Sequence, residues 1–197
     1  LLAALFGNSP FLSQCAVREP TLVHRLFDAG PDRVLADVMD DIKDLRRTDV
    51  DQPALATGLR QAKRRVALLT AVADIAGIWP LERVTAALSD FADAALGCAA
   101  AHLLLQAHVA GTLILADPDN AEHGSGLVIL GMGKRGAHEL NYSSDIDLIV
   151  LYDHECITTD DADSLHRNMV RLTRDMARLI DERTSDGYVF RTDLRLR

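Results

Sequence analysis

The segment that most constrains this chain runs from residue 127 to residue 153, where two apolar runs flank a Gly-Met-Gly-Lys turn. Asp145 and Asp147 stand one residue apart where the second run begins. Alternate side chains of a strand point to the same face, so these two carboxylates can be directed at one point. Mg²⁺ is typically held by one or two carboxylates plus substrate phosphates, so this pattern is typical of a phosphoryl or nucleotidyl transfer site.

A third carboxylate occurs far downstream, in a segment that alternates as a strand should, residues 188–197. If this strand lies beside the one that carries the aspartate pair, Asp193 joins the pair. Three carboxylates can hold two Mg²⁺ ions, which clamp the attacking and leaving oxygens of an in-line displacement. The alternative is that Asp193 is a solvated strand residue among the neighbouring charges of Arg191, Arg195 and Arg197.

Five residues of the turns are candidates for binding phosphate or nucleotide. Gly131 and Gly133 allow backbone N–H groups to approach a phosphate with no Cβ in the way. Lys134 can pair with a phosphate or remain a solvated charge. Ser143 and Ser144 precede the first aspartate, and they can donate to phosphate oxygens or cap the turn by bonding backbone groups.

A competing interpretation is the dinucleotide fingerprint, because Gly131, Gly133 and Gly136 have the required spacing and Asp153 lies where a ribose-binding acid is expected. The intervening segment argues against it. The candidate helix at residues 137–142 is very short, and the next strand carries two carboxylates where such strands are apolar.

Residues 1–118 are expected to form a helical region. Prolines punctuate it at positions 10, 20, 31, 53 and 80. Apolar spacing predicts a helix at residues 59–77, and then one helix, or a pair broken at Gly97, at residues 81–115. The turn-rich stretch at residues 117–124 is the best candidate for a domain boundary.

Residues 119–197 are expected to form a second domain with strands at 127–132, 146–152 and 188–196. A helix at about residues 161–184 has an apolar stripe that should cover the sheet; the stripe consists of Leu165, Met169, Leu172, Met176 and Leu179. The fold class is therefore α+β, with an N-terminal helical region followed by a small mixed sheet with flanking helices.

Charge and composition narrow the function classes. The formal net charge is −8, the acidic excess is spread over the chain, and aromatic residues make up 5%. With no basic patch and few stacking side chains, nucleic-acid binding is not expected. Three scattered cysteines without a C-x-x-C pair disfavour disulfides and zinc and indicate a reducing cytoplasm.

Residues 94–116 contain no Lys, Arg, Asp or Glu and are long enough to span a bilayer. His102, Gln106 and His108 interrupt the stretch, and its many alanines lower its apolar weight. We expect a buried helix and no membrane association. The apolar start of the chain lacks a basic flank and a cleavage pattern, so no signal peptide is expected.

The Gly-Met-Gly-Lys turn and the Glu-Leu-Asn-Tyr-Ser-Ser-Asp-Ile-Asp segment at residues 139–147 resemble the signature of the glutamine synthetase adenylyltransferase/adenylyl-removing enzymes. These enzymes belong to the DNA polymerase β-like nucleotidyltransferase superfamily. Residues 190–197 resemble the third-carboxylate strand of the same family. The similarity also extends upstream, to residues 7–12, 63–69 and 74–81.

The resemblance implies a catalytic triad of Asp145, Asp147 and Asp193 that binds two Mg²⁺ ions, with Mn²⁺ as a possible substitute. Implied partners are glutamine synthetase, a PII-type nitrogen-signalling protein, ATP or ADP, and phosphate. Family members carry two catalytic halves: one removes AMP from glutamine synthetase by phosphorolysis and the other attaches it. Residues 62–81 and 141–147 are more similar to the N-terminal, removing half.

Some positions depart from the family pattern. Arg135 stands where an apolar residue is usual, and Ala137 and His138 replace a commoner Gly-Arg pair. The chain also stops directly after the third-carboxylate strand, so we expect a fragment of a longer enzyme. Three hypotheses follow: an adenylyl-removing domain, an adenylyl-attaching domain or other small nucleotidyltransferase, and a non-catalytic interaction module of the same fold.

Overall fold

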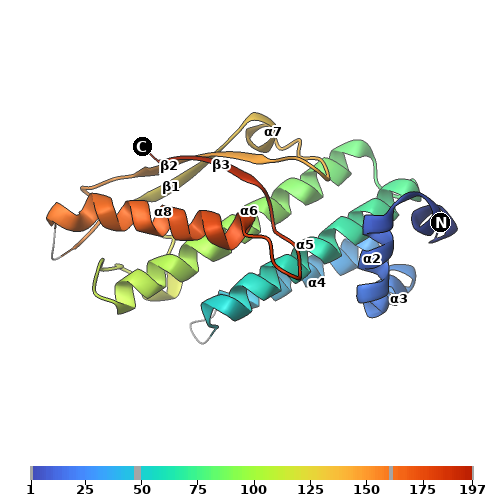
Figure 1. The fold of residues 1–197 in the computed structure, drawn as a ribbon, viewed down its shortest axis with the longest axis horizontal. Helices are drawn as coiled ribbons and strands as arrows, with labels where there is room; N and C mark the ends of the chain where they lie inside the picture. Colours follow the sequence, from blue (N-terminus) through green and yellow to red (C-terminus); the bar gives the residue numbers. More distant parts are fainter. Residues whose placement is uncertain (1, 47–49, 160–161, 197) are drawn as a thin grey trace.

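The structure is a computed structural model that describes residues 2–46, 50–159 and 162–196 (Figure 1). Its helical part contains α1 (Leu2–Asn8), α2 (Pro10–Arg18), α3 (Pro20–Ala29), α4 (Pro31–Asp44), α5 (Gln52–Ile75) and α6 (Leu81–Val109). Then come the short helix η1 (Pro118–Asn120), β1 (Leu127–Met132), α7 (Gly133–Gly136) and β2 (Ile146–Tyr152). The chain ends with η2 (Ala162–Ser164), α8 (Leu165–Asp181) and β3 (Thr192–Leu196).

Three of the prolines that punctuate the helical region stand at the beginnings of helices. Pro10, Pro20 and Pro31 are the first residues of α2, α3 and α4, where the missing N–H is not needed. Ser9 and Asp51 cap α2 and α5, because their side-chain oxygens accept backbone N–H groups at 3.2 and 2.8 Å. The cap at Asp51 explains why α5 begins seven residues before the predicted helix at residue 59.

Helix α6 runs unbroken through Gly97, although a break there was one of the two expectations. A side chain at this position would meet Glu122 and Arg46, whose atoms lie 2.6 and 2.8 Å from an ideal Cβ. Gly97 therefore does not end the helix. Its missing side chain leaves room for the ion pair between Arg46 and Glu122, which lies against the helix at this point. By length and composition α6 could cross a membrane, but 72% of its most apolar window is buried inside the fold.

The described residues contain one three-stranded sheet in the order β1-β2-β3, in which β1 and β2 are antiparallel and β2 and β3 are parallel. Helices α6 and α8 lie along one face of the sheet, and α5 and α4 lie beyond α6 (Figure 1). The predicted stripe of α8 is buried as a whole: Leu165, Met169, Leu172, Met176 and Leu179. The α+β fold class is confirmed, while the boundary between residues 118 and 119 stays a prediction.

The third strand is shorter than predicted, because residues 188–190 do not pair with β2; the first backbone hydrogen bond to β2 is from the N–H of Ile146 to the carbonyl of Arg191, at 2.9 Å. The N–H groups of Val189 and Phe190 both donate to the carbonyl of Ile180, at 2.9 and 3.1 Å. Phe190 is buried against Phe91 of α6, with ring centroids 5.6 Å apart. The segment is therefore tied to two helices before it enters the sheet at Thr192.

Residues 137–142, the candidate helix of the dinucleotide interpretation, are not helical. A single turn, α7, directly follows β1, and His138 after it has φ of 60°. A Rossmann unit needs parallel strands joined by a crossover helix, but β1 and β2 form an antiparallel pair. The dinucleotide interpretation is therefore wrong for this glycine pattern.

Candidate active site

The three strands align a row of residues at one end of the sheet. Asp147 of β2 is the register partner of Met132 on β1 and of Asp193 on β3. Both aspartates are exposed, whereas Ile146 and Leu148 of β2 are buried on the helix side. Asp147 and Asp193 therefore lie side by side on the open face of the sheet, as the sequence pattern requires for a shared site.

Asp145, the third predicted ligand, precedes β2 and is also exposed. Its Oδ1 atom forms an ion pair with Nε of Arg191 at 2.5 Å. The same guanidinium donates to the carbonyl of Ser143 at 3.1 Å. Arg191 thus links the segment before β2 to the segment before β3 and occupies the carboxylate that was expected to face a cation.

The donor set can be tested for its fit to a divalent cation. Among residues 2–46, 50–159 and 162–196, no three carboxylate, thiol or imidazole groups are gathered closely enough to hold a metal ion. Asp147 and Asp193 lie side by side on β2 and β3, and Asp145 is paired with Arg191. Because Asp145 and Arg191 are 56% and 60% exposed, their pairing contributes only about 0–1 kcal/mol. Asp145 can therefore exchange Arg191 for a cation at low cost, and the all-oxygen donors suit Mg²⁺.

We call Asp145, Asp147 and Asp193 the carboxylate row. The glycine turn lies directly over it. Gly133 has φ of +55°, and an ideal Cβ on it would lie 3.1 Å from Oδ2 of Asp147. A side chain there would be strained and would crowd the carboxylate. Gly131 and Gly136 have a different cause: a Cβ on Gly136 would lie 2.6 Å from the carbonyl oxygen of Gly131, so α7 packs backbone to backbone on β1.

Lys134 follows Gly133 and is exposed, with no hydrogen bond or ion pair from its amine to any described residue. Its backbone carbonyl accepts the N–H of Glu139 at 2.8 Å. A free cation one residue from the turn over Asp147 can pair with an incoming phosphate.

The two serines differ in their partners. Ser144 exchanges hydrogen bonds with Asn141: its Oγ accepts the Asn141 N–H at 3.0 Å and donates to Oδ1 at 2.9 Å. Ser144 therefore caps its turn, which was the alternative to phosphate binding. Ser143 is exposed, and its described contacts are through the backbone: its N–H donates to Asn141 and its carbonyl accepts from Arg191.

Helices α5 and α6 hold the segment between α7 and β2 at three points. His138 lies 3.1 Å from Asp90, and the N–H of Leu140 donates to the buried Ser89 hydroxyl at 3.3 Å. The phenol of Tyr142 donates to Asp74 at 3.1 Å. Burial raises the pKa of Tyr142, and the charge and hydrogen bond of Asp74 raise it further, so the phenol stays a donor.

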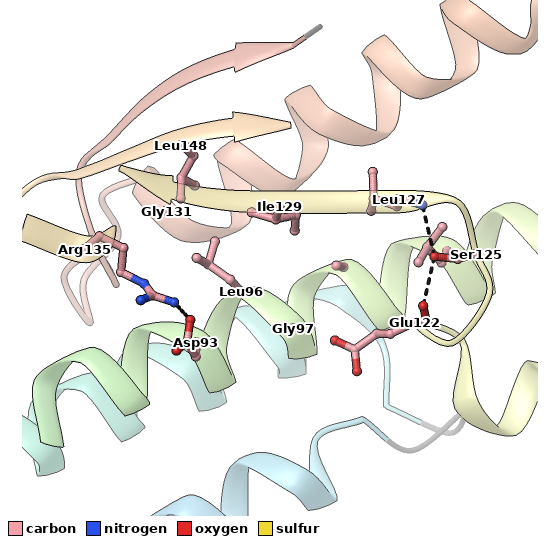
Figure 2. Close-up of a pocket in the computed structure, with 12 residues that line it drawn as sticks. Asp93, Leu96, Gly97, Glu122, Ser125, Leu127, Ile129, Gly131, Arg135 and Leu148 are labelled. Carbon is pink, nitrogen blue, oxygen red and sulfur yellow. Dashed lines mark hydrogen bonds and ion pairs between the residues drawn. The ribbon is translucent and has the colours of Figure 1, made fainter. Parts of the chain in front are cut away.

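Arg135 reaches from α7 to Asp93 on α6 and forms an ion pair there (Figure 2). Its side chain is only 11% exposed. It closes one end of a cavity of about 220 Å³ that lies between α6 and β1, on the helix side of the sheet. The departure from an apolar residue at position 135 is therefore matched by a carboxylate on the facing helix.

The sequence did not single out the helical residues that support the turn. Ser89, Asp90 and Asp93 of α6, with Asp74 of α5, contact the segment after β1. Ser89 is fully buried, and apolar residues precede and follow it at helical spacing, Leu88 and Ala92 among them. A buried hydroxyl in such a position needs a partner, but the sequence does not show which one.

Comparison with known proteins identifies the family. A profile described as glutamate-ammonia ligase adenylyltransferase matches residues 1–197. Bifunctional glutamine synthetase adenylyltransferase/adenylyl-removing enzymes of Brucella suis biovar 1, Bradyrhizobium diazoefficiens and Rhizobium meliloti are 43%, 42% and 43% identical to this chain. Each alignment covers 100% of this chain and 20% of the relative, so the chain spans a fifth of the length of these proteins. The predicted family is confirmed: the chain belongs to the glutamate-ammonia ligase adenylyltransferase family of nucleotidyltransferases.

Proposed function

We propose that this chain forms an Mg²⁺-dependent nucleotidyltransferase site that removes AMP from adenylylated glutamine synthetase, as part of a cytoplasmic enzyme of its relatives' full length. The observation that carries the proposal is the register of β2 and β3, which pairs Asp147 with Asp193 beneath Gly133 on the open face of the sheet. Membership of an adenylyltransferase family supports the substrate, since the names of the relatives include glutamine synthetase.

In the proposed reaction, inorganic phosphate attacks the AMP phosphorus on an adenylylated tyrosine. A phosphate oxygen forms the new bond, the bond from phosphorus to the tyrosine oxygen breaks, and that oxygen takes up a proton. The products are ADP and unmodified glutamine synthetase. Most of the catalysis in such transfers is positioning and charge stabilisation.

Each residue of the site has a proposed role. Asp147, Asp193 and, once free of Arg191, Asp145 would hold two Mg²⁺ ions. Bound Mg²⁺ supplies positive charge that offsets the phosphate oxygens in the transition state. Lys134 and the N–H groups of the turn bind the attacking phosphate. Gly133 keeps the space above Asp147 free of side chains, and Ser143, two residues before Asp145, donates its hydroxyl to a phosphate oxygen.

The alternative is that this unit attaches AMP, using ATP and a tyrosine of glutamine synthetase. A specific observation keeps it in view: the relatives are named for both activities, and the carboxylate geometry serves either direction. The resemblance of residues 62–81 and 141–147 to the removing half favours removal. A PII-type protein is the proposed regulator in either case.

The direction can be tested with the full-length enzyme. It is incubated either with adenylylated glutamine synthetase and phosphate or with unmodified glutamine synthetase and ATP, and ADP release and AMP incorporation are measured. Because each half of a bifunctional enzyme contributes, both assays are repeated with Asp193→Asn in this unit. Loss of ADP release with AMP incorporation retained supports removal; the opposite pattern supports attachment.

A further inference from the structure

A second cavity adjoins the carboxylate row, between α2, α5 and the turn before β3. Its volume is about 460 Å³, which falls in the range of pockets that bind small organic ligands. Ser143 and Ser144, which directly precede Asp145, form part of its wall. The cavity is distinct from the one between α6 and β1, and Ser143 is the one wall residue to which the proposed reaction gives a role.

The charge of this cavity is opposite to that of the whole protein. Its wall contains five cations, namely Arg18, Arg60, Lys63, Arg64 and Arg183, but one carboxylate, Asp186. The chain as a whole has a net charge of −8. A cationic hollow in an acidic protein concentrates small anions.

Two of these cations already have complete sets of partners. Arg60 is buried and donates to the carbonyls of Ala56, Glu182 and Gly187 at 2.6–3.1 Å. Arg64 pairs with Glu19 at 2.8 Å and with Asp186 at 3.4 Å. Both hold the cavity wall together and have little capacity left for a ligand.

The other three cations are available. The amine of Lys63 lies 4.0 Å from the centre of the Phe190 ring, and it has no hydrogen bond or ion pair with any described residue. Arg183 is exposed and likewise has no partner within the described ranges, and Arg18 makes one long contact, 3.4 Å, to the carbonyl of Ser185. Lys63 is partly buried, and an ammonium in such a position without a hydrogen-bond acceptor favours an anion beside it.

Aromatic side chains complete the cavity. The chain contains nine aromatic residues by its count of Trp, Tyr and Phe, and four of them line this cavity: Phe11, Tyr142, Tyr188 and Phe190. Phe11, Tyr142 and Tyr188 are 58%, 39% and 39% exposed, so their faces are accessible to a ligand. Aromatic faces beside cations suit a heterocyclic base that carries a phosphate.

We propose that this cavity is a second ligand site, which binds a nucleoside monophosphate with its phosphate on Lys63 and its base against Tyr142 and Tyr188. The site is separate from the carboxylate row and does not depend on the direction of the nucleotidyl transfer. Since the two sites adjoin at Ser143, an occupied cavity would stand beside the residues that hold Asp145.

The test is isothermal titration calorimetry of the purified protein with AMP, adenosine and inorganic phosphate, in EDTA so that metal-dependent binding to the carboxylate row is silent. We expect AMP to bind more tightly than either fragment. Lys63→Met should weaken AMP at least about tenfold, because a charge-assisted hydrogen bond is lost. Tyr188→Leu should weaken AMP and leave phosphate unchanged. Lys43→Met, which removes an exposed lysine paired with Asp40, is the matched control and should change nothing.

Two results would overturn the proposal. If phosphate binds as tightly as AMP and Tyr188→Leu has no effect, the cavity recognises only the oxyanion. If Asp147→Asn abolishes AMP binding while Lys63→Met does not, the nucleotide binds at the carboxylate row alone. Neither result bears on adenylyl removal, which is measured separately as ADP release. Circular dichroism shows whether each variant is folded, and the spectrum of a folded variant is unchanged.

Discussion

At the scale of single residues, the candidate site depends on a few positions whose neighbours decide what they can do. Asp147 and Asp193 are paired across two parallel strands and have no counter-ion among the described residues. Asp145 has one, Arg191, which is itself exposed. The sequence pattern treats the three carboxylates alike, but they differ in how readily they can bind a cation.

Asp147→Asn in the full-length enzyme should lower the rate at least about a hundredfold, since charge stabilisation of this kind is worth several kcal/mol. The fold should survive, because removing one of several clustered negative charges relieves repulsion. The rate is read from single-turnover assays and the fold from thermal melts. Near-normal turnover of the folded variant would refute the metal site.

Lys63 makes a prediction about stability. Burial lowers its pKa from the ordinary value of 10.5 to about 8. Lys63→Met should therefore stabilise the protein at pH 7, by about 1 kcal/mol, because removing a partly buried charge without a hydrogen-bond acceptor outweighs the loss of its contact with the Phe190 ring. Thermal or urea unfolding measures the difference, with Lys43→Met as the exposed control.

The pH dependence of that difference follows from the sign of the shift. Below about pH 8 the lysine is charged in both the folded and unfolded states, so its burial cost is complete. Between about 8 and 10.5 the folded state loses the proton first, the unfolded state binds more protons, and stability rises with pH. The advantage of Lys63→Met should shrink over this window; an advantage that is absent at pH 7 or grows with pH would contradict the assignment.

At the scale of elements, the turn between α7 and β2 owes its position to the helices below it. The clearest anchor is the Ser89 hydroxyl, which accepts the N–H of Leu140 inside the core. Ser89→Ala leaves this donor without a partner and should cost about 1–3 kcal/mol. Thr70→Val is the control: Thr70 is as deeply buried, but its hydroxyl has no partner, so its loss should be neutral or stabilising. Equal melting temperatures for the two variants would mean that the anchor is unimportant.

Sequence periodicity predicted the elements whose own residues repeat with the period of a helix or a strand. The stripe of α8 and the bounds of β1 and β2 could be read directly, because helix and strand periods differ. The shortened β3 could not, since Val189 and Phe190 are drawn to α8 and α6 by contacts distant in sequence. The partners of Asp145 and His138, which are Arg191 and Asp90, could not be predicted either, because they are also distant in sequence.

At the scale of the whole molecule, a helical region supports a small sheet whose far face carries the carboxylates. The N-terminal helices α1–α3 lie at one end of the molecule, and the sheet lies along the side of α6 and α8 away from α4 and α5 (Figure 1). The helical part is thus a structural base for the site and also forms one wall of the cationic cavity, through α2 and α5.

Helix α6 gives a prediction at this scale. Although its composition would allow a membrane span, it contacts α4, α5 and α8 within one core. The protein should therefore be purified from aqueous buffer without detergent and run on size exclusion at a defined size. A requirement for detergent would show that α6 has been misinterpreted.

The most direct test of the central claim uses the full-length enzyme with Asp145→Asn and Asp147→Asn combined in this unit. ADP release from adenylylated glutamine synthetase is followed in the presence of phosphate, and AMP incorporation is followed with ATP in parallel. The account predicts that ADP release is lost while AMP incorporation continues. A variant that still removes AMP but no longer attaches it would contradict the account and assign this unit to attachment.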